Sequence, residues 1–581
     1  MILVFGGTTE GRKAAEVLEE AGSPYFYSTK TGEQNLALHH GTVLSGAMDG
    51  AAMEAFCREK GIRLIVDAAH PFASQLHATI AAACSDLQIP AVRYERIYPP
   101  RDPDITWIDS YDDLPGVLPI PVQGAGKPFT LLATTGVQSI RRLKPLEQKG
   151  IQVYYRILPR ESSVALAKAQ GATVEQLCYY EDSNAIDVEA DAILLKESGI
   201  SGGFVEKVEA ARAKGMRIIA LKRPELSLRH CINGPYGLRR AIEHLLPDFF
   251  PLHSGLTTGT CATAAAMAQT ARLLHGEQPA EVAVLLPDGE TIMVPVGYCD
   301  GYAYCVKQAG DDPDVTDGIE VRASVQPSES FQILGGTGVG TFTLPGFDFP
   351  PGEPAINKAP REMMRANIPE NVTVTISVPD GEEIARRTFN PRLGIEGGIS
   401  IIGVSGIVKP YSEDAFIDSI RKCMQVAKAS GAERVVINSG FKSEQYLKSY
   451  YPDLPAQAFV QYGNYIGETL RMAHELAMPA VTLGVMLGKA VKLAQGHLDT
   501  HSRKTMMDKG FIQQLLAEAG CSVGIDDITL ARELWAKIPP QQLHDFARTV
   551  VRHCLEHCKP LLPDGELTIL LIDDNGNIYS T

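Results

Sequence analysis

A repeated order of apolar strand, polar or glycine-rich loop and helix constrains the first part of this chain more than any other feature. Residues 2–5 form a short apolar run, a glycine-rich turn follows at 6–11, and a helical pattern continues over 13–20. Residues 63–69 repeat the order with another apolar run that ends in a polar loop. Strands that are joined through helices lie parallel to one another. The sequence therefore predicts a parallel sheet with helices on both faces.

The same order restarts after residues 114–128, a segment rich in proline and glycine that we interpret as a linker. The strands predicted beyond it are 129–133, 192–195 and 216–221. We therefore expect two successive Rossmann-like α/β units, at residues 1–115 and 126–248, with a crevice between them.

The pattern changes after a short junction that is bracketed by Pro247 and Pro251. Residues 287–289, with the sequence Pro-Asp-Gly between two β-rich runs, predict a hairpin. Helix and strand alternate again from residue 412. We therefore expect an α+β domain at 254–410, followed at 411–581 by an α/β portion with a C-terminal extension.

Charge and hydropathy restrict the partners of the chain. Lys and Arg number 54 against 69 Asp and Glu, a formal charge of −15, which argues against nucleic acid as the main partner. No apolar run approaches the roughly 20 residues that span a bilayer, and the first residues lack the basic segment of a signal peptide. The 11 cysteines include no C-x-x-C pair and indicate free thiols. We expect a cytoplasmic protein, and a homo-oligomer is left open.

The first loop is a candidate for binding an anion such as a nucleotide phosphate. Gly6 and Gly11 match the outer glycines of G-x-G-x-x-G, but Thr8 replaces the middle one. Backbone N–H groups and the helix dipole at such a turn favour anions. We name Gly6, Thr8, Thr9, Gly11 and Arg12 as candidate cofactor ligands. The alternative is a tight strand-to-helix turn with no ligand.

Three further positions follow predicted strands of the two α/β units. Lys30 ends a Ser-Thr-Lys run, where the acidic residue that would hold an NAD ribose is missing, so this cluster suits the 2′-phosphate of NADPH or a substrate carboxylate. His70 follows the strand at 63–69, and Lys196 and Ser198 occupy the equivalent edge of the second unit. The alternatives are a structural histidine and a solvated loop.

Together these segments resemble the precorrin-6A reductase family of corrin-ring biosynthesis. The residues that carry the resemblance are 6–12, 68–73, 93–96, 133–136, 196–199 and 202–203. The resemblance covers residues 1–248 and implies an NADPH-dependent reduction of one double bond in a corrin precursor. We see no obvious catalytic dyad in this region.

Hydroxyl residues crowd the start of an alanine-rich helix in the second half. Thr258, Gly259 and Thr260 precede Cys261, and a single hydroxyl would be enough to cap the helix. Exposed N–H groups at this helix start are candidates to bind a carboxylate or the methyl donor. A plain helix cap is the alternative, and no residue close in sequence would activate Cys261 as a nucleophile.

Acidic and histidine clusters give weaker signals. Asp311 and Asp312 begin an acidic run that could bind a divalent metal, attract a sulfonium cation or accept a proton, although such a run is more often a solvated turn. His497 and His501 would share a face on a helix, but the H-E-x-x-H pattern of a zinc site is absent. The pairs at 553–554 and 557–558 are read as incidental.

The second half resembles the cobalt-precorrin-5B C-1 methyltransferase family. The residues that carry the resemblance are 255–262, 309–316, 352–357, 388–394, 397–401, 463–464, 467–468, 488–492, 496–497 and 501–502. The family implies S-adenosylmethionine (SAM) as methyl donor and a cobalt complex as substrate, so the cobalt arrives with the substrate and no protein-bound metal is expected. Residues after 510 carry little resemblance.

The two resemblances concern consecutive steps, because the C-1 methylation product is the substrate of the reductase. We therefore expect a bifunctional enzyme whose partners are corrin-precursor small molecules, with no nucleic acid and no membrane. Catalytic candidates are Asp311, Asp312, Asn390 and His497; Gly463 and Asn464 join the cofactor candidates; and His70, Arg392, Lys489 and Lys492 are the candidate substrate ligands. The alternatives are a chain with only one active half, or a nucleotide- or corrinoid-sensing binding protein.

Overall fold

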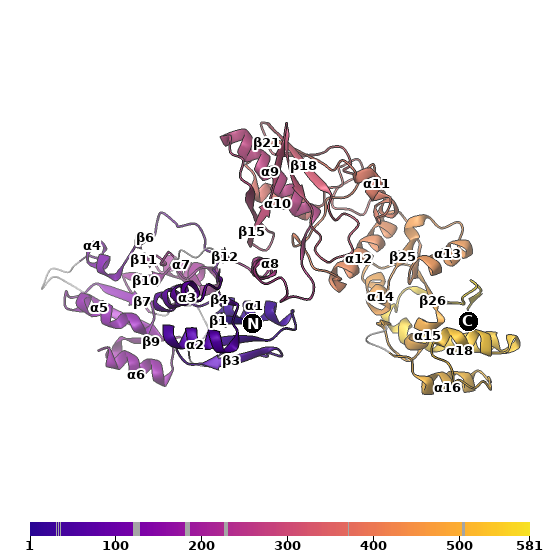
Figure 1. The fold of residues 1–581 in the computed structure, drawn as a ribbon, viewed down its shortest axis with the longest axis horizontal. Coiled ribbons are helices and arrows are strands. Elements are labelled where there is room, and N and C mark those ends of the chain that lie inside the picture. Colours follow the sequence, from indigo (N-terminus) through magenta and orange to yellow (C-terminus); the bar gives the residue numbers. More distant parts are fainter. Residues whose placement is uncertain are drawn as a thin grey trace. The chain divides into compact units, whose positions relative to one another are not determined.

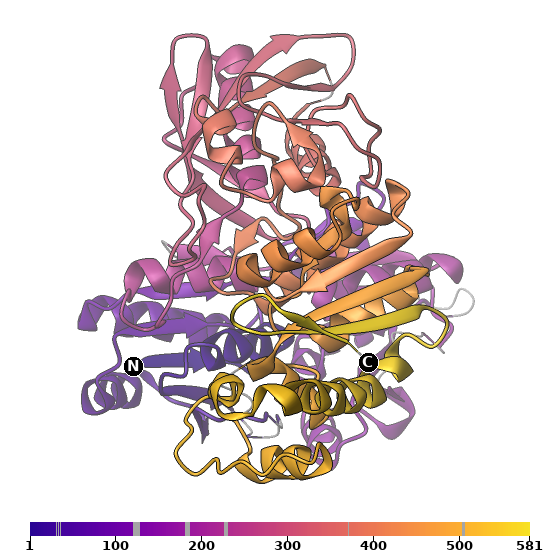
Figure 2. The ribbon, with the colours of Figure 1, turned by 90° about the vertical axis from the view of Figure 1, so that its right-hand side faces the viewer.

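The computed structural model describes residues 1–30, 32, 34, 36–119, 128–180, 186, 188–225, 230–369, 371–501 and 506–580. The chain divides into two compact units (Figures 1 and 2). The first unit contains Met1–His253 and Leu285–Met293, and the second contains Ser254–Val284 and Val294–Thr581. Among the described residues, none of the helices combines the length and the apolar character needed to cross a membrane.

The first sheet of unit 1 has six parallel strands in the order β12-β5-β4-β1-β2-β3. Its strands are β1 (Ile2–Phe5), β2 (Tyr25–Thr29), β3 (Gly41–Ser45), β4 (Leu64–Asp67), β5 (Ala91–Tyr94) and β12 (His230–Ile232), and its helices are α1 (Thr9–Glu19), α2 (Gly50–Lys60), α3 (Ser74–Leu87) and α8 (Pro235–Leu245). Alternation along β1 sends Ile2 and Val4 into a core that Leu238 of α8 also enters. Leu3 and Phe5 enter a second core with residues of α2 and α3. Both faces of the sheet are therefore covered, as predicted.

The second sheet of unit 1 is also parallel, in the order β6-β11-β10-β7-β8-β9. Its strands are β6 (Thr106–Ile108), β7 (Thr130–Ala133), β8 (Gln152–Ile157), β9 (Leu177–Tyr179), β10 (Ala192–Lys196) and β11 (Arg217–Leu221), and its helices are α4 (Leu114–Val117), α5 (Ile140–Glu147), α6 (Glu161–Ala169) and α7 (Phe204–Ala213). Two α/β units were predicted, and this part of the expected fold class is confirmed.

The two sheets do not coincide with residues 1–115 and 126–248, the ranges that we predicted for the two α/β units. Strand β6 already belongs to the second sheet. The chain later returns, and β12 extends the first sheet beside β5 while α8 covers it. The return is driven by apolar burial, since Leu238 and Ile242 of α8 are fully buried. Most of the predicted linker, residues 120–127, lies outside the described residues.

The first part of unit 2 is built around one long buried helix, α9 (Thr258–His275), which packs on β17, β18 and α10. A mixed sheet runs in the order β16-β17-β18-β21-β19. The elements are β13 (Gly255–Leu256), β14 (Glu281–Leu285), β15 (Thr291–Pro295), β16 (Gly297–Cys299), β17 (Tyr302–Val306), β18 (Glu320–Pro327), β19 (Gln332–Gly335), β20 (Thr341–Phe342), α10 (Lys358–Asn367), β21 (Val372–Ser377), α11 (Gly381–Ala385), β22 (Ile395–Glu396) and β23 (Ile407–Val408). Small alanines on α9 allow this close packing against the sheet.

The hairpin predicted around residues 287–289 is present as β14 and β15. Its turn uses Gly289 at φ +89°, a left-handed conformation that favours glycine. The hairpin tip, Leu285–Met293, belongs to unit 1. There the carboxylate of Glu290 accepts hydrogen bonds from the amides of Tyr236 and Gly237 at the start of α8, at 3.1 and 2.9 Å.

The last part of unit 2 is an α/β layer with the sheet order β25-β24-β26-β27-β28, in which only β28 is antiparallel (Figure 2). Its elements are α12 (Glu413–Ala429), β24 (Arg434–Asn438), α13 (Phe441–Tyr450), β25 (Phe459–Gln461), α14 (Ile466–Glu475), β26 (Ala480–Met486), α15 (Leu487–Ala494), α16 (Lys509–Glu518), α17 (Leu534–Lys537), α18 (Leu543–Cys558), β27 (Glu566–Ile572) and β28 (Ile578–Tyr579). Residues after 510 are integral to this layer, because β27 pairs with β26 over its whole length.

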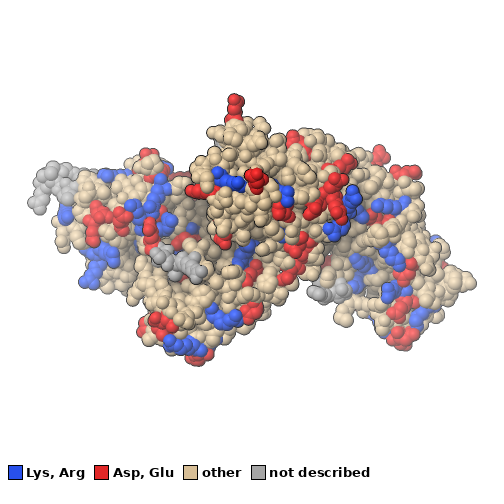
Figure 3. Space-filling model, turned by 45° about the horizontal axis from the view of Figure 1, so that its top comes forward, with Lys and Arg blue, Asp and Glu red and all other residues tan. Residues whose placement is uncertain are grey.

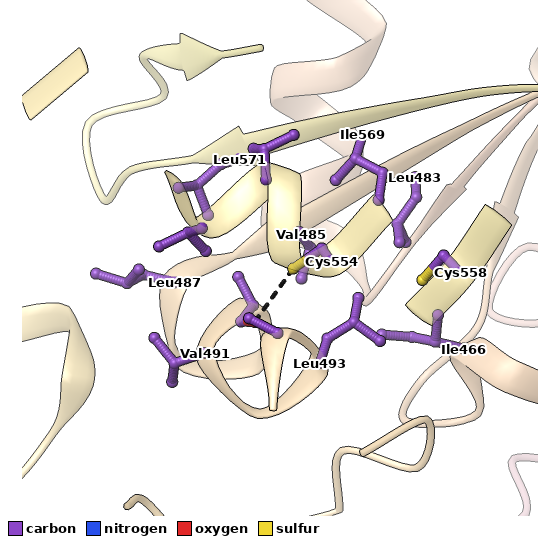
Figure 4. Close-up of a cluster of buried hydrophobic side chains, with 14 of the residues drawn as sticks. Ile466, Leu483, Val485, Leu487, Val491, Leu493, Cys554, Cys558, Ile569 and Leu571 are labelled. Carbon is purple, nitrogen blue, oxygen red and sulfur yellow. Dashed lines mark hydrogen bonds between the residues drawn. The ribbon is translucent and has the colours of Figure 1, made fainter. Parts of the chain in front are cut away.

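Helix α18 supplies part of the core of this last layer. Cys554 and Cys558 are fully buried among aliphatic side chains, and the Cys554 thiol donates to the carbonyl of Ala490 at 3.3 Å (Figure 4). Burial raises the pKa of both thiols. These cysteines are packing residues, which agrees with the interpretation of the 553–558 pairs as incidental.

Candidate active sites at the sheet edges

The first candidate site lies where the strands of the two parallel sheets of unit 1 end. The loop after β1 begins with Gly6, where a Cβ atom would lie 2.0 Å from the Tyr27 hydroxyl, so only glycine fits. Thr8 caps α1 by accepting from the Gly11 amide at 2.9 Å, and its hydroxyl donates to the Ala68 carbonyl at 2.6 Å. The loop is thus fixed by contacts within the chain.

Glu10 lies in the first turn of α1, at the helix start where the sequence predicts that an anion binds. Its carboxylate is buried and accepts from Arg96 Nε at 2.9 Å and from the Ser201 hydroxyl. Burial alone would raise the pKa of Glu10, but Arg96 and Ser201 outweigh it and lower the pKa. An ionised carboxylate therefore already interacts with this helix start. The cofactor role of Gly6, Thr8, Thr9, Gly11 and Arg12 stays a prediction.

Arg96 also joins the two sheets. Its Nη1 donates to the Ser198 carbonyl at 2.7 Å, and the Ile200 amide donates to the Ile97 carbonyl at 2.9 Å. A Cβ atom on Gly199 would lie 2.9 Å from the Arg96 side chain, so the loop after β10 approaches closely because it has glycine there. The ends of β1, β5 and β10 are in this way brought to one place.

His70 rests on a buried charged network behind the end of β4. Asp67 is fully buried and accepts from His77 Nδ1 at 2.6 Å and from Arg93 Nη1 at 3.0 Å. The other ring nitrogen of His77 is 3.0 Å from the His70 carbonyl oxygen. Because each of these side chains is itself bonded, the network fixes the backbone of the His70 loop.

The ring of His70 is neutral near neutral pH. Burial, followed by the positive charges of Arg96 and Lys196, lowers its pKa to about 4. The Phe72 amide donates to Nδ1 at 3.2 Å, so the remaining proton of the neutral ring lies on Nε2. His70 can therefore donate one hydrogen bond to a ligand, which is compatible with its predicted role as a substrate ligand.

Lys196 ends β10, and its Nζ lies 5.0 Å from the centroid of the Phe72 ring, which comes from the first α/β part. Burial, and then the charge of Arg142, lower the pKa of Lys196. Within the described residues, no carboxylate pairs with this ammonium group. Ser198, the other candidate here, is buried, and its hydroxyl donates to the Gly202 carbonyl at 3.1 Å.

Lys30 is the predicted ligand of unit 1 that stands apart. It is exposed just after β2, and the neighbouring Thr29 hydroxyl accepts from the Gly32 amide at 3.1 Å. No contact places Lys30 with His70 or Lys196. Its selectivity for a 2′-phosphate stays a prediction.

The start of α9 is more enclosed than its sequence indicates. Thr260 is fully buried, and its hydroxyl donates to the Gly406 carbonyl at 2.6 Å. The Gly259 amide donates to the Ile402 carbonyl at 2.9 Å, and the Ile402 amide donates to the Thr258 hydroxyl at 2.9 Å. The cap itself is Thr257, which accepts from the Thr260 amide at 3.2 Å. The hydroxyls and one amide that were expected to face a ligand thus bind the loop at 402–406.

The acidic run after β17 and the Asn390 turn are structured by their own side chains. Asp312 accepts from the Tyr411 amide at 2.9 Å, and Asp314 pairs with the buried Lys307 at 2.8 Å. Asp311 lies in the same turn. Asn390 is buried and bonds Ser400 and the Gly398 carbonyl at 3.2 and 3.4 Å.

Arg392 is committed to an ion pair that joins the two parts of unit 2. Its Nη1 lies 2.7 Å from Glu444 Oε2, which also accepts from Gln461 at 2.8 Å. Burial opposes the charge of Glu444, but Lys448, Gln461 and Arg392 outweigh it, so its pKa is lowered. Arg392 also lines a small cavity of about 20 Å³ with Phe389 and Cys423, too small for a ligand larger than water.

The second candidate site lies at the ends of β25 and β26, where four predicted residues come together. Lys489 donates to the Gly463 carbonyl and lies 5.5 Å from the Tyr462 ring centroid. Lys492 Nζ donates to the Thr500 carbonyl at 3.3 Å, and the Thr500 amide donates to the Asn464 carbonyl at 3.1 Å. Burial and then Lys492 lower the pKa of Lys489 to about 8. In an open parallel sheet, this edge is where ligands bind.

His497 and His501 do not share a helical face. Helix α15 ends at Ala494, and Gly496, at φ +98°, turns the chain into the loop that follows. His497 is exposed, and the His501 amide donates to Asp499 Oδ1 at 3.0 Å. The expectation that helical spacing relates the two histidines was wrong; Ser502 lies outside the described residues.

Some residues of these sites were missed by sequence reasoning. Glu10 and Arg96 lie in segments that carry the reductase resemblance, but they are 86 positions apart and no sequence signal pairs them. Arg142 lies in no motif. The Asp67–His77 contact had a signal, because an acidic residue ending a buried strand and a histidine on the next helix meet at one sheet edge. Figure 3 shows acidic and basic side chains interspersed over one face of the molecule.

Two family descriptions match the chain in succession. Residues 1–242 match precorrin-6x reductase CbiJ/CobK, and residues 248–410 match CbiD. Among curated proteins, the cobalt-precorrin-5B C(1)-methyltransferase of Prosthecochloris aestuarii is 41% identical over 345 residues, which cover 55% of this chain and 94% of the relative. The same enzyme from Priestia megaterium is 42% identical over 349 residues, 57% of this chain and 94% of the relative.

Solved structures give partial matches. A cobalamin biosynthesis protein (cbiD) from Archaeoglobus fulgidus is 29% identical with a TM-score of 0.26, covering 46% of this chain and 85% of that one. A CobK precorrin-6A reductase is 21% identical with a TM-score of 0.35, covering 42% and 97%.

The two successive matches indicate a two-part biosynthetic enzyme, with a reductase domain ahead of a methyltransferase. The chain belongs to the cobalt-precorrin-5B C(1)-methyltransferase family of cobalamin biosynthesis, and its residues 1–242 form a precorrin-6x reductase (CbiJ/CobK) domain.

Proposed function

We propose that this chain is a bifunctional enzyme that methylates cobalt-precorrin-5B at C-1 with SAM and then reduces the product, cobalt-precorrin-6A, to cobalt-precorrin-6B with NADPH. The observation that carries the proposal is the succession of a reductase domain and a methyltransferase in one chain. The two reactions follow one another, so the fusion keeps both activities at equal amounts. We further propose that the protein acts in the cytoplasm on small corrin precursors.

The reductase reaction is assigned to the sheet edge where Arg96 joins the two sheets of unit 1. The phosphates of a nicotinamide dinucleotide or the carboxylates of a substrate fit this edge, because Lys196 and Arg142 are cations that no described carboxylate pairs with. When bound, NADPH supplies the hydride. His70 contributes an Nε2–H donor held in place by the Asp67–His77 network. Phe72 offers an aromatic surface to a planar ring.

Methyl transfer is assigned to unit 2, with the ends of β25 and β26 as the candidate site. SAM supplies the methyl group when bound. The protein must hold donor and acceptor in line and exclude water. Holding two reactants in the correct orientation is equivalent to an effective molarity of about 10⁵ M or more. Lys489 and Lys492 donate to carbonyl oxygens and are available to exchange these bonds for substrate carboxylates. Asn464 and Gly463 border the same sheet edge, and Gly463 has a φ of +60°.

The test is a single-chain assay with purified full-length protein, cobalt-precorrin-5B, SAM and NADPH. We expect the substrate to gain one methylene mass with SAM alone and two further hydrogens once NADPH is added. Omitting SAM should leave NADPH unoxidised. A chain that methylates but never oxidises NADPH would show that only one half is active, and a chain that binds the corrin without turnover would favour the sensor alternative.

A further inference from the structure

Reduction of a carbon–carbon double bond needs a proton as well as a hydride, and the source of that proton is sought at the sheet edge of unit 1 where Arg96 joins the two sheets. The identity of this proton donor rests on the proposed reductase function. A proton donor must lie at this edge, carry a proton at working pH and not be locked in an ion pair. These criteria can be applied in turn to the titratable side chains at the sheet edges.

The carboxyl groups fail because they are ionised and paired. Glu10 is bonded to Arg96, and Glu95 to Arg93 and Tyr98. Glu197 is bonded to Arg101 and Arg223, at 3.0 and 2.7 Å. Burial opposes ionisation of Glu10, Glu95 and Glu197, but these partners hold the pKa of each below its usual value. Asp67 is sealed behind His77 and Arg93, with no exposed surface.

The histidines and tyrosines fail for other reasons. His70 is neutral, with a pKa of about 4, and is far too weak an acid in that form. His77 is buried, with both ring nitrogens bonded inside the protein. Burial raises the pKa of Tyr27 and Tyr98, so neither releases a proton readily.

Two lysines remain, and their surroundings distinguish them. Lys207 of α7 donates its ammonium proton to the Gly202 carbonyl at 2.9 Å. Lys196 faces the Phe72 ring from the end of β10, at the point where the two sheets meet, and no described carboxylate holds it. The charged and titratable groups that interact with it are Arg142 and His70, and Arg96 acts on the same His70 ring. Its position and the lack of a counter-ion among the described residues make its proton transferable.

We propose that Lys196 is the catalytic residue that protonates the corrin precursor during its reduction. The Nζ–H bond breaks and a C–H bond forms at one carbon of the double bond, while the hydride supplied by the bound nicotinamide forms the C–H bond at the other. The neutral amine then takes a proton from solvent. The sum is substrate, NADPH and one proton giving reduced product and NADP⁺.

The test compares Lys196→Arg, Lys196→Gln and the matched control Lys207→Arg in the full-length protein. Arginine keeps the positive charge but does not give up a proton. We expect both Lys196 variants to lose at least about a hundredfold in turnover. Lys196→Arg should keep the wild-type Kd for NADPH. The control Lys207→Arg should keep both the wild-type turnover and the wild-type Kd for NADPH. Wild-type turnover should fall as pH rises through the pKa of Lys196.

A second readout needs no turnover. The rate at which an acylating reagent modifies Lys196, followed peptide by peptide over a pH series, reports the amine in the protein without ligands. Burial and Arg142 lower the pKa of Lys196, so its reactivity should rise at lower pH than that of a lysine in a short reference peptide.

Each outcome decides the matter. Wild-type turnover by Lys196→Arg would overturn the proposal, because charge alone would then be sufficient. Acylation of Lys196 that follows the curve of the lysine in the reference peptide would overturn it as well. If the wild-type protein never oxidises NADPH with its substrate, the proposed reductase function fails, and the role of Lys196 fails with it whatever the acylation curve shows.

Discussion

Glu10→Ala should destabilise the reductase part strongly, because it leaves Arg96 buried without its partner. The two side chains are 8% and 6% exposed, and Arg96 Nε lies 2.9 Å from Glu10 Oε2. Removing one member of a buried ion pair costs about 3–5 kcal/mol. For a domain of this size, about 2–4 °C is lost per kcal/mol, so the unfolding midpoint of unit 1 should fall by about 6–20 °C.

Calorimetry of the full-length chain is the assay, with Glu16→Ala as the matched control. Glu16 lies on the same helix and is exposed, so the change in helix propensity is the same and no buried partner is lost. We expect only the transition of unit 1 to move. A fall that equals the control would refute the reasoning, because Arg96 would then be satisfied by the Ser198 carbonyl alone.

The same pair makes a pH prediction. The pKa of Glu10 is lower in the folded protein than in the unfolded chain. Its contribution to the free energy of unfolding is therefore complete above the unfolded pKa and is lost as pH falls through the folded one. The difference in stability between wild type and Glu10→Gln should shrink steadily as pH falls below about 4.5, and a difference that stays constant would contradict the assignment.

Three further predictions concern other places. Thr260→Ala should cost about 1 kcal/mol in unit 2, because its hydroxyl's bond to the Gly406 carbonyl is lost while the Thr257 amide still donates to that carbonyl at 3.2 Å. Chemical denaturation checks this cost, and a methylation loss at unchanged stability would instead restore the ligand role predicted for this loop. Lys30→Gln should reduce the preference for NADPH over NADH by about tenfold, measured as the ratio of kcat/KM, and an unchanged ratio would mean that the 2′-phosphate binds elsewhere. A fragment that ends at residue 253 should be more stable to urea than one that ends at 246, because Phe249 and Phe250 are buried in the first core, and equal midpoints would show that these rings add nothing.

The sequence predicts the repeated parts of the fold well and the returning part poorly. Apolar runs such as residues 2–5 and 63–69 correctly predict strands, because a parallel strand that is buried on both faces is a continuous apolar run. Strand β12 has only the residues His230, Cys231 and Ile232, which carry no strand pattern. Its place in the first sheet depends on long-range pairing with β5, and no local signal encodes that.

For the candidate sites, sequence reasoning finds the loops but not the state of their side chains. It places Lys196 and His70 at the ends of strands, where the structure has them. It could not show that Glu10 is paired with Arg96, or that the Thr258–Thr260 hydroxyls are used by residues 402–406. These facts depend on partners far away in sequence, and a motif lists residue types without their partners.

The reductase and methyltransferase parts handle charge at their sheet edges in a common way. In unit 1 the buried carboxylates are bonded to arginines, and in unit 2 Glu444 is bonded to Arg392. Lys196 instead faces an aromatic ring, and Lys489 donates to a carbonyl oxygen beside another ring. A partly buried ammonium group held so weakly is costly unless an anion arrives. The lowered pKa values of both lysines express that cost, and a corrin precursor rich in carboxylates is the kind of ligand that would remove it.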